Sequence, residues 1–552
     1  MLVYRDGRRR VAGCELLSGL QAAVARLDLA PAPPDEAAIL DALVRAGELE
    51  CALGDAESRA ALAIAQLTDS LADQLLDPRG LQFRNSAIRQ FGNFPVPATL
   101  SVSAPEGFAY YALHPRHYAE LAERALLAEA PVAVIGIRSI GTTLSAVVVA
   151  AARRRSLPAE RITVRPAGHP FDRHTRFSEE QRTWIGTMVA RRARFLVVDE
   201  GPGLSGSSFL SVAEALERDG VPARQITLLA SHAARPEMMC APQAAERWPR
   251  FQCLAVEGGP QVPAEAAVSL CGGQWRRHFG WEAARWPACW PAVERAKFLS
   301  RDGRMLFKFE GFGAYGSAPI ARSAELARAG FGPRVADAGQ GFAAYEILAG
   351  ERLPAAPLSG PLLRELARYC AFRRETLATD RICDPAPLAE LLQTNVREEL
   401  AFEAGDRFDV HYEAAPAVIT DGRMQPHEWL PLPDGRLQKF DAASHGDDHF
   451  YPGPTDIAWD LAGAIIEWAM DQRAAELFVN AYRNATADDP TRRLPFFLAA
   501  YAAFRVGWCR MAEGATGDPQ EKQRLRRAGD GYRAVLERGV RALAPRDAAR
   551  VA

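Results

Sequence analysis

Two adjacent acids and a short run of small hydroxyl residues are the side chains in this chain best suited to chemistry. Asp199 and Glu200 end an apolar run that begins at Phe195 and reads as a buried strand. The small residues that open the following apolar-periodic helix are Ser205, Gly206, Ser207 and Ser208. A helix start built from small residues exposes backbone N–H groups to an anion. Carboxylates at a strand end can accept hydrogen bonds from sugar hydroxyls or lie beside a divalent cation. The pattern therefore predicts a site for a 5-phosphoribosyl group.

A second loop of similar character lies upstream. The apolar run 132–137 predicts a strand, and Arg138, Ser139 and Gly141 follow it before another apolar helix. The guanidinium of Arg138 suits phosphate oxygens, and a glycine at 141 lets the backbone approach a ligand closely. Between the two loops, residues 165–173 interrupt the alternation of strands and helices. This segment is either a flap that closes over a diphosphate or a polar surface excursion.

Together these loops resemble the phosphoribosyl pyrophosphate signature of type I phosphoribosyltransferases. The resemblance implies that Asp199 and Glu200 bind the ribose and that Ser205 to Ser208 bind the 5-phosphate. It also implies that Arg138 and Ser139 bind the pyrophosphate, that Arg138 assists catalysis, and that Mg²⁺ is the cofactor. The spacer between the acids and Ser205 is one residue longer than in the family, and it lacks the acid that some members use as a base.

A second set of chemical groups lies in the C-terminal half. Lys308 falls on the second strand of a predicted hairpin, residues 294–300 and 305–310, and Asp421 and Asp441 each follow an apolar run. Phosphoryl transfer needs a cation on the nucleotide phosphates, an acid for Mg²⁺ and a carboxylate that orients the acceptor hydroxyl. The chain has 66 basic residues, of which only Lys297, Lys308, Lys439 and Lys522 are lysine. In a chain that favours arginine, a lysine near these acids indicates a need for a compact point charge.

The order of these residues resembles the aminoglycoside phosphotransferase and choline kinase branch of the protein-kinase-like fold. The resemblance assigns ATP binding to Lys308, Glu325, Glu346 and Leu348, catalysis to Asp421, and metal binding to Asp441 and His427. Asp460 would be the family's Asp-Leu-Ala aspartate. The histidine that normally lies two residues before the base is Ile419, and His427 is the nearest residue to the missing metal-binding asparagine. A phosphate-binding pseudokinase is therefore the open alternative for this half.

The segment His445-Gly-Asp447-Asp-His449 competes with Asp421 for the role of catalytic loop, because it looks more like the family's His-Gly-Asp motif. Spacing decides against it. Between Asp447 and Asp460 there is no room for a strand hairpin that carries a separate metal-binding acid. Asp421, Asp441 and Asp460 leave room for one.

The elements that position these groups predict an α/β multidomain protein. Strands and helices alternate over residues 101–264, which predicts a mainly parallel sheet with helices on both faces, and ligands at the carboxyl ends of its strands. We expect a helical region of unassigned function at 1–100, the phosphoribosyltransferase-like domain at 101–264, and a two-lobed α+β kinase-like domain at 265–552.

Composition excludes several classes of protein. The formal net charge of −2 argues against a general nucleic-acid binder, and no apolar run is long enough to span a membrane. The nine cysteines form no CxxC pair, so neither zinc nor a disulfide framework is predicted and a cytoplasmic location fits best.

The two resemblances together imply transfer of a phosphoribosyl group from phosphoribosyl pyrophosphate to an unidentified acceptor, coupled to an ATP-dependent small-molecule kinase. The pathway would make a nucleotide-like metabolite. The alternative is a non-enzymatic nucleotide sensor, in which the first fold binds a phosphorylated nucleotide and a pseudokinase acts as scaffold.

Overall fold

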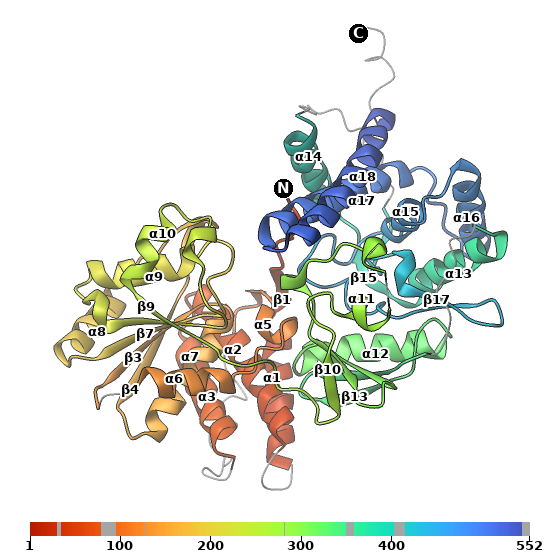
Figure 1. Cartoon of the computed structure of the whole chain (residues 1–552). Coiled ribbons are helices and arrows are strands. Elements are labelled where there is room, and N and C mark those ends of the chain that lie inside the picture. Colours follow the sequence, from red (N-terminus) through yellow and green to blue (C-terminus); the bar gives the residue numbers. More distant parts are fainter. Residues whose placement is uncertain are drawn as a thin grey trace.

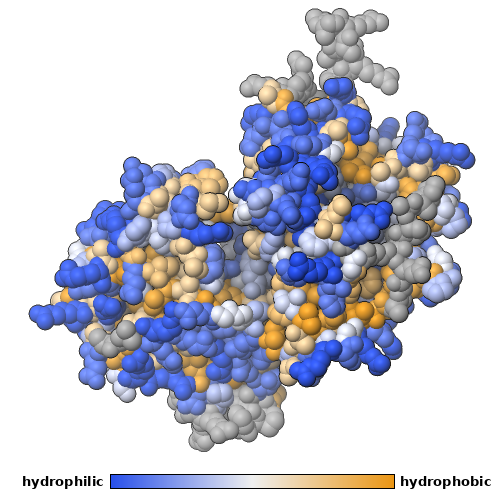
Figure 2. Space-filling view, viewed as in Figure 1, coloured by the Kyte–Doolittle hydropathy of each residue, from blue (hydrophilic) through white to orange (hydrophobic). Residues whose placement is uncertain are grey.

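The computed structural model describes residues 1–29, 35–78, 95–126, 129–280, 282–348, 358–401 and 414–543. Figure 1 shows an α/β half on one side and a second half, made of an antiparallel sheet and long helices, on the other. Figure 2 shows a largely hydrophilic surface whose outline is deeply indented between these two halves. No helix in the described ranges is long and apolar enough to cross a bilayer.

The α/β half is built on a five-stranded parallel sheet with the order β4-β3-β7-β8-β9 in the described residues. Its strands are β3 (Val132–Ile137), β4 (Ala159–Val164), β7 (Arg194–Val198), β8 (Ile226–Ala230) and β9 (Gln252–Ala255). The sequence predicts strands at 132–137, 161–164, 195–198, 225–229 and 251–256, and all five are present to within two residues at each end. The chain moves from β3 outward to β4 and then crosses back to β7, so the order of connection reverses between β3 and β7.

Helices cover both faces of this sheet, and alternate residues of each strand point to the two faces. Val132 and Val134 of β3 face one core, while Ala133 and Ile135 face the other. The first core is covered by α1 (Gly13–Leu29), α2 (Glu36–Asp55), α3 (Ala60–Leu76), α6 (Arg116–Ala125) and α7 (Ile140–Arg154). The second is covered by α8 (Glu179–Ala190), α9 (Ser207–Arg218) and α10 (Ala244–Arg247).

The N-terminal helices therefore share a core with the parallel sheet, and a boundary at residue 100 does not separate two cores. The short strands β1 (Arg9–Ala12) and β2 (Thr99–Val102) pair across the predicted boundary. The short helix α5 (Glu106–Ala109) follows directly. The same core also contains Phe307, Phe309 and Phe342 from the second half. In Figure 1, α1 and α2 lie between the two sheets.

The second half begins with an antiparallel sheet of order β10-β11-β12-β14-β13 among the described residues. Its strands are β10 (Ala266–Ser269), β11 (Lys297–Ser300), β12 (Met305–Phe309), β13 (Val335–Gly339) and β14 (Phe342–Glu346). The predicted hairpin is present, with Lys297 opposite Lys308 across β11 and β12. The helix α12 (Ala314–Arg328) leads from β12 to β13, and α11 (Trp275–His278) lies between β10 and β11.

The remaining C-terminal elements are mainly helical. The helices are α13 (Gly360–Thr376), α14 (Ala386–Leu400), α15 (Ala458–Glu467), α16 (Gln472–Ala485), α17 (Leu494–Ala515) and α18 (Pro519–Leu543). Two small antiparallel pairs join β15 (Ala378–Ile382) to β16 (Pro416–Val418) and β17 (Trp429–Pro431) to β18 (Leu437–Lys439). The second pair is the hairpin that the sequence predicts between Asp421 and Asp441.

Candidate functional site

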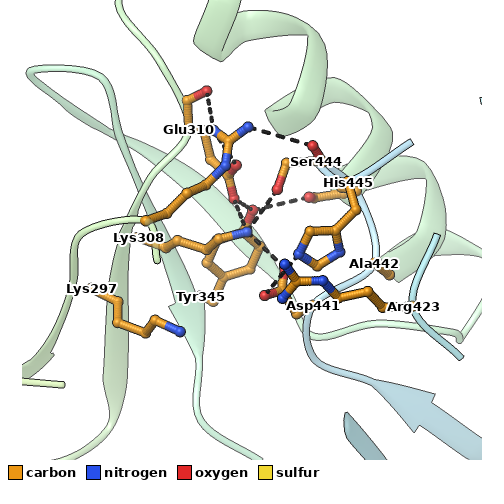
Figure 3. A network of polar contacts seen from close by, with 12 residues as sticks. Lys297, Lys308, Glu310, Tyr345, Arg423, Asp441, Ala442, Ser444 and His445 are labelled. Carbon is orange, nitrogen blue, oxygen red and sulfur yellow. Dashed lines mark hydrogen bonds and ion pairs between the residues drawn. The ribbon is translucent and has the colours of Figure 1, made fainter. Parts of the chain in front are cut away.

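Lys308 on β12 is the centre of a polar network where the antiparallel sheet meets the C-terminal helices (Figure 3). Its ammonium group lies 2.7 Å from Asp441 Oδ1 and 3.1 Å from Glu310 Oε1, and it donates to Ser444 Oγ at 2.7 Å. Lys308 is buried, so the cation is held in one place by three oxygen atoms from two segments. The structure thus brings together the lysine and the metal-binding acid that the sequence predicts.

Asp441 immediately follows the β17–β18 hairpin, which fixes where its carboxylate points. Burial alone would raise the pKa of Asp441, but the nearby positive charge of Lys308 and Lys297 holds it well below its usual range. Figure 3 shows Arg423 and His445 beside the same carboxylate, and His445 Nε2 lies 3.5 Å from Asp441 Oδ2. Asp441 is therefore an ionised oxygen donor in a strongly cationic environment.

Asp421, the predicted catalytic base, is completely buried. Its Oδ1 atom lies 2.9 Å from Lys439 Nζ, and its Oδ2 atom accepts a hydrogen bond from the Tyr369 hydroxyl. Arg373 lies 3.8 Å away from the same carboxylate. These partners engage both oxygens of the carboxylate, so no free oxygen of Asp421 faces an acceptor hydroxyl in this arrangement, and its role as a base stays a prediction.

Asp460 at the start of α15 explains why this loop is so well fixed. Its carboxylate accepts hydrogen bonds from the backbone N–H groups of Asp421 and Gly422, at 2.7 and 3.0 Å. Gly446 packs directly on the same loop, because a Cβ atom there would lie 1.8 Å from the carbonyl oxygen of Thr420. The loop before Asp421 and the segment from His445 are therefore in contact, although the sequence presents them as competing alternatives.

Glu325 does not take its predicted place beside Lys308. It pairs with Arg328 one turn further along α12 at 3.4 Å, and Glu310, the residue directly after β12, is the acid beside Lys308 instead. The residue of α12 that faces the network is Arg322, which donates to the Ala443 carbonyl and pairs with Asp447 at 2.9 Å. Sequence reasoning did not assign Arg322, although it lies one turn before Glu325 on the same helix.

The predicted metal ligand His427 also has a different environment. Its ring stacks on Trp275, with the two ring centroids 5.7 Å apart and an interplanar angle of 15°. Burial lowers its pKa to about 3, so the ring is neutral. Imidazole is a poor ligand for Mg²⁺, which prefers oxygen. The described ranges contain no group of three or more His, Cys, Asp or Glu side chains arranged to hold a metal.

Glu346 and Leu348, which the resemblance assigns to the hinge that meets the adenine of ATP, lie at the end of β14 and two residues beyond it. Glu346 pairs with Arg334 at 2.8 Å on the surface, and its backbone N–H donates to the Arg334 carbonyl. Leu348 is half-buried and is the last described residue before 358. Their predicted contact with adenine stays a prediction.

The α/β half has its chemical groups at the carboxyl edge of the parallel sheet, between β3 and β7. This is the point where the order of connection reverses, and such a point is where open parallel sheets bind ligands. Asp199 and Glu200 follow β7, and Arg138 and Ser139 follow β3. The four predicted residues thus lie at the carboxyl ends of two neighbouring strands, as their positions in the sequence imply.

The acidic pair is desolvated. Burial raises the pKa of Asp199 to about 7, although Arg165 and Arg173 oppose the shift. Burial and the neighbouring carboxylates of Glu106 and Asp199 raise the pKa of Glu200 well above its usual range. Glu200 Oε2 accepts a hydrogen bond from the N–H of Gly107 in α5 at 2.8 Å. Two carboxylates in this state have much to gain from a ligand that donates hydrogen bonds or brings a cation.

The serine loop has the form expected of an anion site. Gly206 lies directly before α9 and adopts a left-handed backbone conformation, with φ 70°. Glycine adopts this conformation without strain because it has no Cβ atom. Ser205 and Ser207 donate from their hydroxyls to the Pro170 carbonyl at 3.0 and 2.6 Å. Pro170 is the tip of a hairpin formed by β5 (Ala167–His169) and β6 (Asp172–His174). Residues 165–173, which interrupt the alternation of strands and helices in the sequence, therefore contain a hairpin whose tip covers the serine loop.

Arg138 is less available than the sequence suggests. It donates to the Gly54 carbonyl at 2.9 Å and to Thr163 Oγ1, and it lies 3.3 Å from Asp55. These contacts tie it to the end of α2. Next to it, Ser139 has φ 145° and ψ −109°, a conformation that a non-glycine residue rarely adopts and that is concentrated at ligand sites.

Two arginines that sequence reasoning did not assign lie closer to the acidic pair. Arg165 and Arg173 both act on the charge of Asp199. Burial and the positive charge of Arg165 and Arg8 lower the pKa of Arg173. Arg165 pairs with Asp55 at 2.5 Å, and the mutual repulsion of the arginines would be reduced by a bound anion.

Comparisons with known proteins give no family for the chain. No family model and no curated protein matches it. Among solved structures, a choline kinase from Streptococcus pneumoniae is 15% identical and covers 44% of this chain and 89% of its own, with a TM-score of 0.29. A choline/ethanolamine kinase family protein from Mesorhizobium loti is 17% identical and covers 45% and 89%, with a TM-score of 0.31.

An aminoglycoside phosphotransferase from Alicyclobacillus acidocaldarius is 14% identical and covers 52% of this chain and 98% of its own, with a TM-score of 0.29. Scores this low do not establish a shared fold. The kinase-like interpretation of the C-terminal half therefore rests on the residues around Lys308 and Asp441.

Proposed function

We propose that the C-terminal half binds a nucleoside triphosphate with Mg²⁺ at Lys308 and Asp441 and transfers the terminal phosphoryl group to a small hydroxyl compound. The observation that supports this is the 2.7 Å contact between Lys308 Nζ and Asp441 Oδ1, from the sheet to the segment after β18. A nucleotide phosphate needs a cation of this kind, and its metal needs an acid of this kind.

Of the two predicted metal ligands, Asp441 fits Mg²⁺ and His427 does not. Asp441 supplies an ionised carboxylate, and Mg²⁺ is commonly bound by one or two carboxylates together with substrate phosphates and water. His427 does not fit, since its ring packs on Trp275. Asp441 would hold the metal, which would neutralise charge on the phosphates while Lys308 orients them.

The test is calorimetric titration of Mg·ATP into the full chain. The wild type should bind, whereas Asp441→Asn should lose the Mg²⁺-dependent part of the affinity and Lys308→Met should weaken binding at least tenfold. Lys522→Met on α18 is the matched control, because it removes the same charge elsewhere. Equal affinity in all four proteins, or no binding by the wild type, would refute the proposal.

A second function is favoured by the polar residues at the carboxyl ends of the paired strands β3 and β7. There the α/β half would bind phosphoribosyl pyrophosphate, with Asp199 and Glu200 on the ribose hydroxyls and the Ser205–Ser208 loop on the 5-phosphate. Arg165 and Arg173 would hold the diphosphate, and the hairpin tip at Pro170 would move off the serine hydroxyls as phosphate enters. An acceptor nucleophile would then attack the anomeric carbon, and pyrophosphate would leave with the electron pair of the broken C–O bond.

The test is binding of phosphoribosyl pyrophosphate and Mg²⁺-dependent release of pyrophosphate. Asp199→Asn combined with Glu200→Gln should weaken binding, since each lost charge-assisted hydrogen bond costs about 1.5–3 kcal/mol. Binding without any pyrophosphate release, with a broad panel of nucleophiles, would favour the nucleotide-sensor alternative. Unchanged affinity in the folded double variant would refute the ribose assignment.

A further inference from the structure

The nucleotide site proposed above lacks a base at the expected position, because Asp421 is enclosed. From the geometry of the neighbouring cavity we infer that Asp448 is the carboxylate that accepts the acceptor's proton during phosphoryl transfer. This inference rests on the proposed phosphotransfer function of the C-terminal half. Asp448 is the residue directly after Asp447 in the segment 445–449, and neither predicted register of the catalytic loop gives it a role.

Asp448 lines the same cavity as the nucleotide-binding pair. The cavity is small, about 30 Å³, and Lys308, Asp441 and Asp448 all contribute to its wall. Asp421 and Asp447 do not line it. Asp447 instead points toward α12, where Arg322 lies 2.9 Å from its carboxylate. A group that takes a proton from the attacking hydroxyl must lie near the phosphoryl group, and Asp448 meets that condition.

The partners of the three acids in the cavity wall distinguish Asp448. Glu294 binds Lys297, the Gly273 N–H and the Trp275 indole, at 3.0, 2.8 and 2.9 Å. Asp441 is held by Lys308. Asp448 accepts a hydrogen bond from the Phe450 N–H at 2.9 Å, and no ion pair to it is found within the described part of the chain. Its carboxylate is thus fixed in place and is not neutralised by a bound cation.

Two histidines in the same wall indicate that the cavity takes a polar occupant. His445 and His449 are both more than nine-tenths buried, and the Nδ1 atom of each has no hydrogen-bond partner among the described residues. The other ring nitrogen of His449 lies 2.9 Å from the Tyr111 hydroxyl, which fixes the ring. Buried polar atoms are normally satisfied, so a ligand hydroxyl or water belongs here.

The electrostatic environment suits the role. Burial raises the pKa of Asp448 to about 6, against the opposing charges of Arg295 and Arg423. A carboxyl group with this pKa is ionised at neutral pH and is a stronger base than an ordinary aspartate. In the transfer step, the hydroxyl proton moves to the Asp448 carboxylate as the acceptor oxygen bonds to the γ-phosphorus. The bond from that phosphorus to its bridging oxygen breaks, and ADP leaves with the electron pair.

The experiment measures ADP formation from Mg·ATP by the full chain, with water or ribose as acceptor, alongside the calorimetric affinity for Mg·ATP. Asp448→Asn should lower turnover about 100-fold or more and leave the affinity within twofold, because a general base acts on the transition state. Asp447→Asn is the matched control one residue away and should retain turnover. If Asp448→Asn does not fold, Asp448→Ala with added formate serves instead, and formate should restore part of the turnover.

The outcomes separate this inference from the proposed function. Loss of turnover confined to the Asp448 variants, with nucleotide affinity intact, supports it. Full turnover in folded Asp448→Asn, or a formate-insensitive Asp448→Ala, overturns it and leaves nucleotide binding unaffected. A wild type that binds Mg·ATP but forms no ADP also overturns it. A wild type that binds no Mg·ATP removes the proposed function itself.

Discussion

Replacement of Lys439 by methionine tests whether Asp421 is a structural residue. Lys439 is buried at the end of β18, and its ammonium group lies 2.9 Å from Asp421 and 2.8 Å from Glu428. It also donates to the Asp441 carbonyl at 2.7 Å. Methionine has a similar length and keeps the packing, but it leaves two carboxylates without their shared cation.

The expected cost is large because the group is fully enclosed. Removing one partner of a buried ion pair destabilises a protein by about 3–5 kcal/mol. Asp421 and Lys439 have no exposed side-chain surface, so solvent cannot screen the loss. Asp421→Asn should likewise destabilise the protein, whereas a solvent-exposed catalytic base could be replaced with little change in stability.

The loss of stability in Lys439→Met should depend on pH in a defined direction. Burial already raises the pKa of the Glu428 carboxyl to about 7, and without the opposing charge of Lys439 this pKa should rise further. An acid whose folded pKa is raised contributes stability below its unfolded pKa and loses it as pH rises through the folded value. The stability difference between wild type and Lys439→Met should therefore be smaller at pH 5 than at pH 8.

Urea unfolding followed by tryptophan fluorescence measures these differences. The control is Asp434→Asn, which removes an exposed pair with Arg436 in the turn before β18 and should leave the unfolding midpoint unchanged. A folded Lys439→Met of wild-type stability at both pH values would show that the buried network is not what fixes this loop. If Asp421→Asn keeps full stability and abolishes only transfer, Asp421 is the base after all.

Three further outcomes test the sites directly. Asp441→Asn should abolish the increase in melting temperature that Mg·ATP produces, and retention of that increase would contradict the metal assignment. Because burial raises the pKa of Asp199 to about 7, this residue costs the free protein stability as pH rises from about 4 to 7, and Asp199→Asn should flatten that slope in a thermal melt. Arg173→Met should weaken phosphoribosyl pyrophosphate binding more than ribose 5-phosphate binding, and more than Arg138→Met does. Equal effects of Arg173→Met and Arg138→Met on both ligands would rule out a diphosphate position at Arg173.

The sequence predicted the elements well because their signals are local. Mainly apolar runs of four to six residues identified the parallel strands, and the Asp-Gly turns at 302–303 and 434–435 identified the β11–β12 and β17–β18 hairpins. The positions of Asp199, Glu200 and Asp441 follow from these elements, since each comes directly after a strand. A residue that ends a parallel strand must lie at the carboxyl edge of the sheet, whatever surrounds it.

The environment of Asp421 could not be predicted in the same way. Tyr369 and Arg373, which enclose it, lie on α13 about fifty residues earlier, and nothing in the spacing shows which face of that helix turns inward. The sequence predicted that Glu325 faces the Lys308 network, but Arg322 does so. Spacing alone does not show which of two residues one turn apart on α12 faces the sheet. Burial and partner choice at these positions are set by contacts between distant segments.

The boundary predicted at residue 264 can be tested by expressing residues 265–552 alone. Phe312 donates its backbone N–H to Phe108 and packs on the ring of that residue, with the two centroids 6.4 Å apart. Phe309 and Phe342 belong to the same core as α1 and α2 and are fully buried. Exposing three phenylalanine side chains costs about 5–9 kcal/mol, at 1.5–3 kcal/mol each. That approaches the whole stability of an ordinary domain. We expect the fragment to aggregate or to lack a cooperative unfolding transition. A fragment that unfolds cooperatively and binds Mg·ATP with full affinity would show that residue 264 is the edge of an independent unit.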